Sequence, residues 1–333
     1  MKSPLHRLAV LAALVAFAVI VLGAYVRLSH AGLGCPDWPG CYGQLTWPVE
    51  SHEVARAAEA FPERPVESDK AWKEMVHRYL AGALVLLVVA INLLCWTGRY
   101  RKEGLRGLAA ALLALILFQA ALGMWTVTLK LLPLVVMAHL MGGLATFCLL
   151  LWLAWRSGPA AATGSLASFR LPILIGLSVL VVQLALGGWT SANYAALACP
   201  DFPTCHDVLW PDANFSEGFV LWREIGVDYE GGVLDMQARV AIHLAHRLGA
   251  LITLLVLGIL SVRLIRTPAA RQEGLVLGAL LVAQIGLGIQ NVVLQLPLIN
   301  VVAHNGMGAL LLAMTLWLTY RSALRPAAAL QSH

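Results

Sequence analysis

The chain has 333 residues, of which 59% are hydrophobic and only 12% are charged. Soluble domains carry about a quarter charged residues, so this composition excludes a water-soluble protein of this length. The formal net charge of +5 comes from Lys and Arg residues that are scattered singly. This distribution argues against nucleic-acid binding and instead suggests the loop asymmetry that orients membrane proteins.

Eight segments are long and apolar enough to cross a bilayer, which takes about 20 residues per helix. In chain order they cover residues 8–28, 74–97, 105–128, 133–155, 171–192, 239–262, 273–295 and 298–320. None shows the alternation of a barrel strand, so we expect an all-α, polytopic membrane protein. The first segment follows Lys2 and Arg7 as a signal peptide would, yet it is too long and no small-residue cleavage site follows it. We therefore expect it to remain as the first helix.

The short connections and the tails predict the orientation of the chain. One side holds 13 of the 23 Lys and Arg residues but only two acids, Glu103 and Glu273. Those bases are Lys2, Arg7, Arg99, Arg101, Lys102, Arg106, Arg156, Arg170, Arg263, Arg266, Arg271, Arg321 and Arg325. The positive-inside rule then places both termini in the cytoplasm and the two long loops, 29–73 and 193–238, outside.

The sequence repeats itself. Residues 23–41 align with 187–205 at an offset of 164, and both stretches end in Cys-Pro-Asp-aromatic-Pro-x-Cys. Further on, two His-Arg pairs and two Gln-to-His spacings of 20 residues also recur. We predict two tandem four-helix bundles, 1–160 and 161–333. Because each contains an even number of helices, we expect a pseudo-twofold axis along the membrane normal to relate them.

Four cysteines form two Cys-x5-Cys pairs in the loops predicted to lie outside. The pairs are Cys35 with Cys41 and Cys199 with Cys205. An oxidising compartment and this spacing favour two disulfides. A metal site is the alternative, with His206 as the one neighbouring ligand, and redox chemistry by the thiols also stays open.

Four histidines lie at matching depth, roughly 10 Å into the predicted spans. They are His77, His139, His246 and His304, two in each predicted bundle. Facing neutral imidazoles suit the two axial positions of a haem iron, whereas zinc favours a third protein ligand and copper a Cys or Met. The alternative is that each histidine is a packing residue with its own buried hydrogen-bond partner.

Charged residues near these histidines differ between the halves. Arg78 and Arg247 directly follow two of the histidines, and with Arg27 they could bind haem propionates or reach the membrane surface. Glu74 stands three residues before His77, where the second half has His243. Glu74 would then lie on the face of His77 and relay protons, or be a solvated acid at a helix start. The difference suggests a reactive haem in the first half and an electron-carrying haem in the second.

These motifs together resemble the haem A synthase family over nearly the whole chain. They are Glu74-Met-Val-His77-Arg78, Ala138-His139, His243-Leu-Ala-His246-Arg247 and Ala303-His304-Asn305. The two cysteine loops resemble those of the bacterial members that carry cysteine pairs. The resemblance implies that the C8 methyl of haem O is oxidised to a formyl group by successive hydroxylations with water loss, giving haem A for terminal oxidases.

The resemblance also implies a role for each site residue. His77 and His139 match the histidines for the substrate haem, and Glu74 matches the functional acid of the family. His246 and His304 match the axial ligands of a haem b cofactor. It further implies a bacterial plasma (inner) membrane, haem O delivered by a haem O synthase and an electron donor of unknown identity; a homo-oligomer is left open.

Two other functions compete with this interpretation. A two-haem b-type cytochrome that only carries electrons would explain the four histidines and the repeat, but it leaves Glu74 without a role. A transporter could use the histidines as a proton relay. The transporter hypothesis predicts no haem absorbance in the purified protein.

Overall fold

The computed structural model describes residues 3–97, 104–159 and 166–324. Within them, eight helices are long and apolar enough to cross a membrane, and extended structure is limited to two isolated bridges. The prediction of an all-α protein with eight spans is confirmed. The predicted cytoplasmic residues outside these ranges are Lys2, Arg99, Arg101, Lys102, Glu103 and Arg325.

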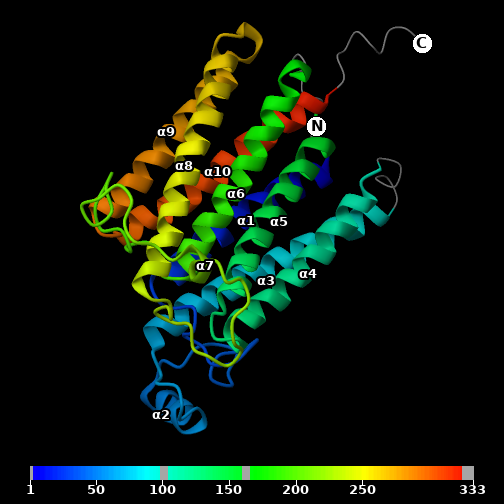
Figure 1. Ribbon diagram of the computed structural model, residues 1–333. Coiled ribbons are helices and arrows are strands. Elements are labelled where there is room, and N and C mark those ends of the chain that lie inside the picture. The colour runs from blue at the N-terminus through cyan, green and yellow to red at the C-terminus, as the bar shows by residue number, and fades with distance from the viewer. Residues whose placement is uncertain (1–2, 98–103, 160–165, 325–333) are drawn as a thin grey trace. The chain divides into compact units, whose positions relative to one another are not determined.

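The first compact unit contains four of the spanning helices. It comprises Met1–Ser157, Ala192–Tyr194 and Val220–Leu234. Its spanning helices are α1 (Pro4–Leu28), α3 (Ser68–Trp96), α4 (Arg106–Thr128) and α5 (Pro133–Ser157). Both α1 and α4 pack against α3 and α5 (Figure 1), so the four helices form a ring in which α3 and α5 are diagonal partners.

Helix α3 begins at Ser68, earlier than the predicted start at residue 74. Its first turns are polar and carry the ion pairs Lys70–Glu67 at 2.9 Å and Lys73–Asp69 at 3.6 Å. A hydropathy window cannot detect such an extension, because these turns contain few apolar residues. Glu74 therefore lies in the second turn of α3, not at the helix start.

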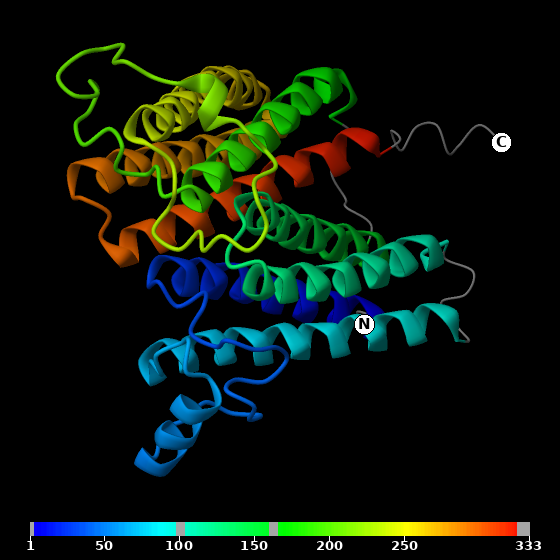
Figure 2. The ribbon, with the colours of Figure 1, turned by 60° about the horizontal axis from the view of Figure 1, so that its bottom comes forward.

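The first disulfide loop packs on the N-terminal end of α3, together with the short helix α2 (Ser51–Ala60) (Figure 2). Cys35 and Cys41 are joined in a disulfide and are fully buried. They share a cluster with Ala57 of α2 and with Ala71 and Met75 of α3. This packing fixes the loop against the helix turn that carries Glu74.

The first unit also includes part of the second long loop, residues Val220–Leu234. Tyr229 is 2% exposed in a cluster with Leu33 and Leu132, and its backbone N–H donates to the Lys130 carbonyl at 3.1 Å. Arg64 of the first loop forms ion pairs at 3.4 Å with two acids of this segment. They are Asp228 and Glu230. The two long loops therefore meet within one unit.

The second compact unit comprises Gly158–Ser191, Ala195–Phe219 and Asp235–His333. Its spanning helices are α6 (Arg170–Ala192), α8 (Met236–Ile265), α9 (Arg271–Val293) and α10 (Leu298–Ala323). Three short helices accompany them: η2 (Ala167–Phe169) precedes α6, α7 (Phe215–Gly218) lies between α6 and α8, and η3 (Pro268–Ala270) lies between α8 and α9.

The second unit repeats the ring of the first. Helix α9 packs against α8 and α10. Helix α6 closes the ring, because its Gly176 faces Leu257 of α8 and its Leu184 faces Gly308 of α10. Helices α8 and α10 are therefore diagonal partners, as α3 and α5 are in the first unit. The axis that would relate the two bundles stays a prediction.

Candidate functional site

In the first unit, the two histidines stand on diagonal helices, His77 on α3 and His139 on α5. Both histidines are half-buried. Each ring lies against a glycine of a neighbouring helix. A Cβ atom on Gly23 of α1 would stand 2.9 Å from His77 Nε2, and one on Gly123 of α4 would stand 3.4 Å from His139 Cε1. A larger residue at Gly23 would displace the ring.

The second unit places His246 of α8 and His304 of α10 in the same way. These histidines are also half-buried. A Cβ atom on Gly187 of α6 would lie 3.1 Å from His246 Cε1, and one on Gly288 of α9 would lie 3.1 Å from His304 Cε1. All four histidines thus occupy equivalent positions in their bundles, each seated on a glycine.

These residues fit a haem better than a metal ion bound by protein ligands alone. Within the described ranges, no three His, Cys, Asp or Glu side chains gather closely enough to hold a metal ion. A haem iron needs only two axial ligands from the protein, since the porphyrin supplies the other four. The buried Nδ1 atoms of His139 and His304 have no hydrogen-bond partner among the described residues. Packing histidines normally have such partners, so these two nitrogens fit a site for a bound group.

The rings of the second unit also have polar neighbours from other helices. The Gln183 amide nitrogen of α6 lies 3.0 Å from His246 Nδ1, and the Gln284 amide nitrogen of α9 lies 3.2 Å from His304 Nε2. In the first unit, the counterpart of Gln284 is Gln119, whose amide nitrogen has no hydrogen-bond partner within the part of the chain that the structure describes. The two units therefore hold their histidines differently.

Glu74 is 5% exposed, so it is not the solvated helix-start acid of the alternative interpretation. Its Oε2 accepts the Cys35 N–H at 2.9 Å, and its Oε1 forms an ion pair with Arg78. One oxygen of the carboxylate thus accepts a hydrogen bond from the disulfide loop, and the other pairs with the Arg78 guanidinium. Its acceptor oxygens satisfy donors that would otherwise be buried without a partner.

His243 occupies the equivalent place in the second unit and is 4% exposed. Its Nδ1 accepts the Cys199 N–H at 3.2 Å, and Arg247 Nε lies 3.3 Å from its Nε2. A neutral imidazole accepts a hydrogen bond at only one nitrogen, whereas a carboxylate accepts at both oxygens. A cysteine N–H and an arginine therefore contact this side chain in both units, but only Glu74 can carry a negative charge.

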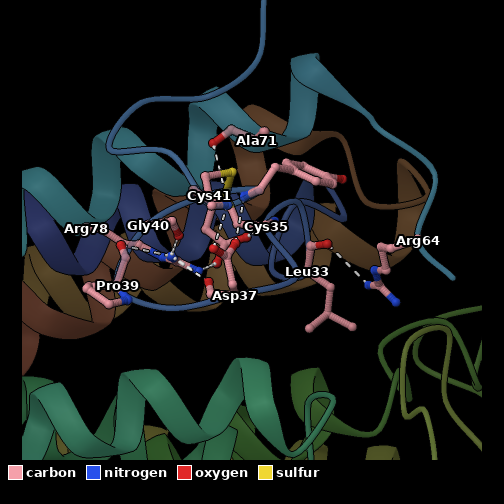
Figure 3. Close-up of a disulfide and its surroundings, with 12 residues drawn as sticks. Leu33, Cys35, Asp37, Pro39, Gly40, Cys41, Arg64, Ala71 and Arg78 are labelled. Atoms are coloured by element: carbon pink, nitrogen blue, oxygen red, sulfur yellow. Dashed lines mark hydrogen bonds and ion pairs between the residues drawn. A yellow bond between two sulfur atoms is a disulfide. The ribbon is translucent and has the colours of Figure 1, made fainter. Parts of the chain in front are cut away.

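Arg78 binds the first disulfide loop (Figure 3). Its Nη1 donates to three backbone carbonyl oxygens, those of Asp37 at 2.9 Å, Pro39 at 3.2 Å and Gly40. Arg247 does the same in the second loop. Its donors reach the carbonyl oxygens of Thr204 at 2.7 Å, Asp201 at 2.8 Å and Cys199 at 3.1 Å. The predicted contact of either arginine with a haem propionate stays a prediction.

The two loops share their backbone geometry. Cys199 and Cys205 are joined in a disulfide, as Cys35 and Cys41 are. In the second loop, Asp201 accepts the Thr204 hydroxyl, the His206 N–H at 2.7 Å and the Asp207 N–H at 3.1 Å. The Thr204 hydroxyl, followed by these backbone donors, lowers the pKa of Asp201 to about 2.

His206 was the one candidate to join a metal site at the second cysteine pair. Its Nε2 lies 2.9 Å from the Ala198 carbonyl oxygen. The cysteines beside it are joined in a disulfide, so their sulfur atoms are not thiolate ligands. This arrangement favours the disulfide interpretation over the metal site.

Two side chains near the site were not identified from the sequence. The Tyr194 ring stacks under the Arg27 guanidinium, 4.0 Å from the ring centroid, within the first unit. Gln183 contacts His246. An amide in an apolar span could have drawn attention to Gln183, but the repeat aligns it with Val19 and so conceals it.

Comparison with known proteins identifies relatives of the chain over most of its length. A family model described as cytochrome oxidase assembly protein (COX15-CtaA) matches residues 6–316. A heme A synthase of Shewanella oneidensis is 46% identical over 305 residues, covering 91% of this chain and 92% of the relative. Heme A synthases of Caulobacter sp. (strain K31) and Beijerinckia indica are each 30% identical, over 93% and 91% of this chain and 93% and 88% of their own lengths.

The chain belongs to the COX15-CtaA family of cytochrome oxidase assembly proteins. The match runs from α1 into α10 and so includes both histidine pairs and both disulfide loops. The family resemblance found in the sequence motifs is confirmed.

Proposed function

We propose that this multi-pass membrane protein is a haem A synthase, an oxidoreductase that converts haem O to haem A for terminal oxidases. The C8 methyl group would be oxidised to a formyl group by successive hydroxylations with water loss, with an oxidant from outside the chain taking up two electrons in each hydroxylation. Family membership and the named relatives support this reaction. The difference between Glu74 and His243, in otherwise equivalent frames, supports the division of labour described next.

The first unit would bind the substrate haem O. His77 and His139 would hold its iron, because they stand on the diagonal helices α3 and α5 of one bundle. When haem O is bound, it supplies the methyl group that is oxidised. Glu74 would take up protons on one carboxylate oxygen while Arg78 holds the other, and burial keeps water from screening the acid.

The second unit would bind the haem b cofactor through His246 and His304. There, His243 occupies the position of the acid, so no carboxylate is available at this position for proton transfer. This is consistent with a site that carries electrons and leaves its haem unchanged. Arg247 and Arg78 would bind propionates in addition to their loop carbonyls.

We infer the orientation and the partners from charge and family. The excess of bases in the short connections supports termini in the cytoplasm and disulfide loops outside the inner membrane. Disulfides are stable in that oxidising compartment. A haem O synthase would deliver the substrate, and a separate donor would supply electrons.

The haem content of the purified chain tests the proposal. The chain is expressed with and without a haem O synthase, and the extracted haems are separated by chromatography. We expect haem b in both preparations and haem A only when haem O is supplied. Haem b alone in both would support an electron-carrying cytochrome, and no haem at all would support the transporter hypothesis.

A further inference from the structure

Gln119 is a buried carboxamide in the middle of the spanning helix α4. The residue is 8% exposed, and its amide nitrogen has no hydrogen-bond partner among the described residues. A buried N–H donor without an acceptor destabilises a fold, so a glutamine that serves packing alone normally bonds to a neighbour. A group from outside the chain would supply the missing acceptor.

Gln119 lies one helix turn from the place of the His139 ring. On α4 it precedes Gly123 by four residues, so the two share a face, and the His139 ring lies against Gly123. The carboxamide rests on Gly142 of α5, three residues after His139, because a Cβ atom on Gly142 would stand 1.8 Å from Gln119 Nε2. The turn that joins α4 to α5 packs on Leu33 of the first long loop. Gln119 is therefore about 5 Å further from that loop than the ring is.

The second unit has the glutamine but not the glycine. The repeat matches Gln119 with Gln284 and Gly142 with Met307, both at an offset of 165. The Gln284 amide nitrogen instead lies 3.2 Å from His304 Nε2. A methionine side chain would fill the place in which the Gln119 carboxamide rests. Within the described ranges, the donor at this depth is thus specific to the first unit.

The two haems of the proposed function differ in the polar group that such a donor would meet. Haem O carries a hydroxyl on the carbon that joins its isoprenoid chain to the porphyrin, where haem b has an apolar vinyl group. This hydroxyl lies on the porphyrin edge away from the propionates. Arg78, which would bind a propionate, contacts the first disulfide loop. The opposite edge would then point deeper into the span, where Gln119 lies.

We propose that Gln119, resting on Gly142, is a specificity-determining residue that donates a hydrogen bond to the side-chain hydroxyl of haem O, so that the first unit prefers haem O to haem b. The inference rests on the proposed function and deepens it. A vinyl group at this place would leave the buried donor without a partner, and such a site rejects a ligand that lacks the matching polar group. A donor at this depth in one unit only would sort two similar haems within one chain.

The test measures the affinity of the first unit for the two haems. The background variant carries His246→Ala and His304→Ala, so that haem binds only between His77 and His139. The haem-free chain, purified in detergent, is titrated with haem O and separately with haem b, and binding is followed in the Soret band. We expect Gln119→Leu to weaken haem O binding about tenfold, through the loss of one buried hydrogen bond, and to leave haem b binding within twofold.

Gly142→Ala tests the same contact without removing the glutamine. The added Cβ displaces the flexible end of Gln119, so haem O binding should weaken in the same way. Two matched controls should bind both haems as the background does. Gly107→Ala lies at an exposed position on the same helix as Gln119, with no described atom within 4 Å of the added Cβ. Gln284→Leu removes the counterpart in the second unit.

Haem A distinguishes the side-chain hydroxyl from the oxygen at C8, because it carries both. Gln119→Leu should weaken haem A and haem O binding equally, and a loss confined to haem A would overturn the proposal by assigning the donor to the formyl oxygen. Equal weakening of haem O and haem b would indicate packing and also overturn it, as would no weakening of either. If Gln119→Leu does not fold, Gly142→Ala decides alone. A background variant that binds no haem O would instead defeat the proposed function, and this inference with it.

Discussion

Near the N-terminal ends of α3 and α8, the same arrangement of a disulfide loop and an arginine surrounds one residue that differs between the two units. In both, an arginine binds the carbonyls of a disulfide loop, and a side chain four residues earlier accepts a cysteine N–H. That side chain is Glu74 in the first unit and His243 in the second. Because this arrangement forms around either residue, the disulfide loop does not need an acid at this position to pack on its helix. We propose that the acid in the first unit serves the reaction.

The largest expected effect is the loss of one haem from one unit. His246→Ala should remove the low-spin haem b signal and leave the first-unit haem in place, and His77→Ala should do the reverse. Each substitution removes one of the two bonds from histidine to the haem iron in that unit, and alanine cannot replace it. Haem content and visible spectra of the purified variants measure both results. An intact haem b spectrum in His246→Ala would contradict ligation there.

The comparison is tested most directly by giving the first unit the histidine that the second unit has at this position. Glu74→His should fold with its haem bound, since His243 fills the same frame, but haem A formation should fall about 100-fold or more. The reciprocal His243→Glu serves as the control and should retain haem b. Product is measured by chromatography of extracted haem. Unchanged haem A formation in Glu74→His would remove the catalytic role of the acid.

Removing the disulfides should separate stability from activity. Each short closed loop contributes about 2 kcal/mol by its chain entropy, so Cys35→Ser with Cys41→Ser and Cys199→Ser with Cys205→Ser should lower thermal stability similarly. Haem A formation should fall further in the first pair, because the Cys35 N–H binds Glu74. Melting temperature and product yield are measured on both. Equal yields would show that the first disulfide loop does not position Glu74.

The smallest effect concerns pH and the second loop. The pKa of Asp201 is lowered to about 2, so its carboxylate stabilises the fold above its unfolded pKa near 4 and loses this contribution as the pH falls towards 2. Asp201→Asn should therefore lower the melting temperature by a constant amount from pH 5 to 8, and the difference should shrink below about pH 4. A difference that grows on acidification would contradict these hydrogen bonds.

Much of the fold follows from local patterns, and the remainder depends on tertiary contacts. Hydropathy predicts all eight spans, because each apolar helix is continuous. It misses the start of α3 at Ser68, where ion pairs rather than apolar residues support the first turns. The placement of Val220–Leu234 in the first unit depends on Tyr229 and Arg64, whose partners are distant in sequence.

The candidate site divides in the same way. The repeat predicts which histidines pair, since spacing and helix order determine their depth and side. It also predicts the exchange of Glu74 for His243. The binding of Glu74 to the Cys35 N–H requires the folded loop, and Gln183 is concealed because its counterpart Val19 is apolar.

The central claim is that the first unit oxidises haem O while the second retains haem b. The most direct test is the haem composition of the purified wild-type chain and of Glu74→His, each expressed with a haem O synthase. The wild type should contain haem b and haem A, and the variant should contain haem b with haem O. If haem A is never found in the wild type, or is equally abundant in Glu74→His, the account is contradicted.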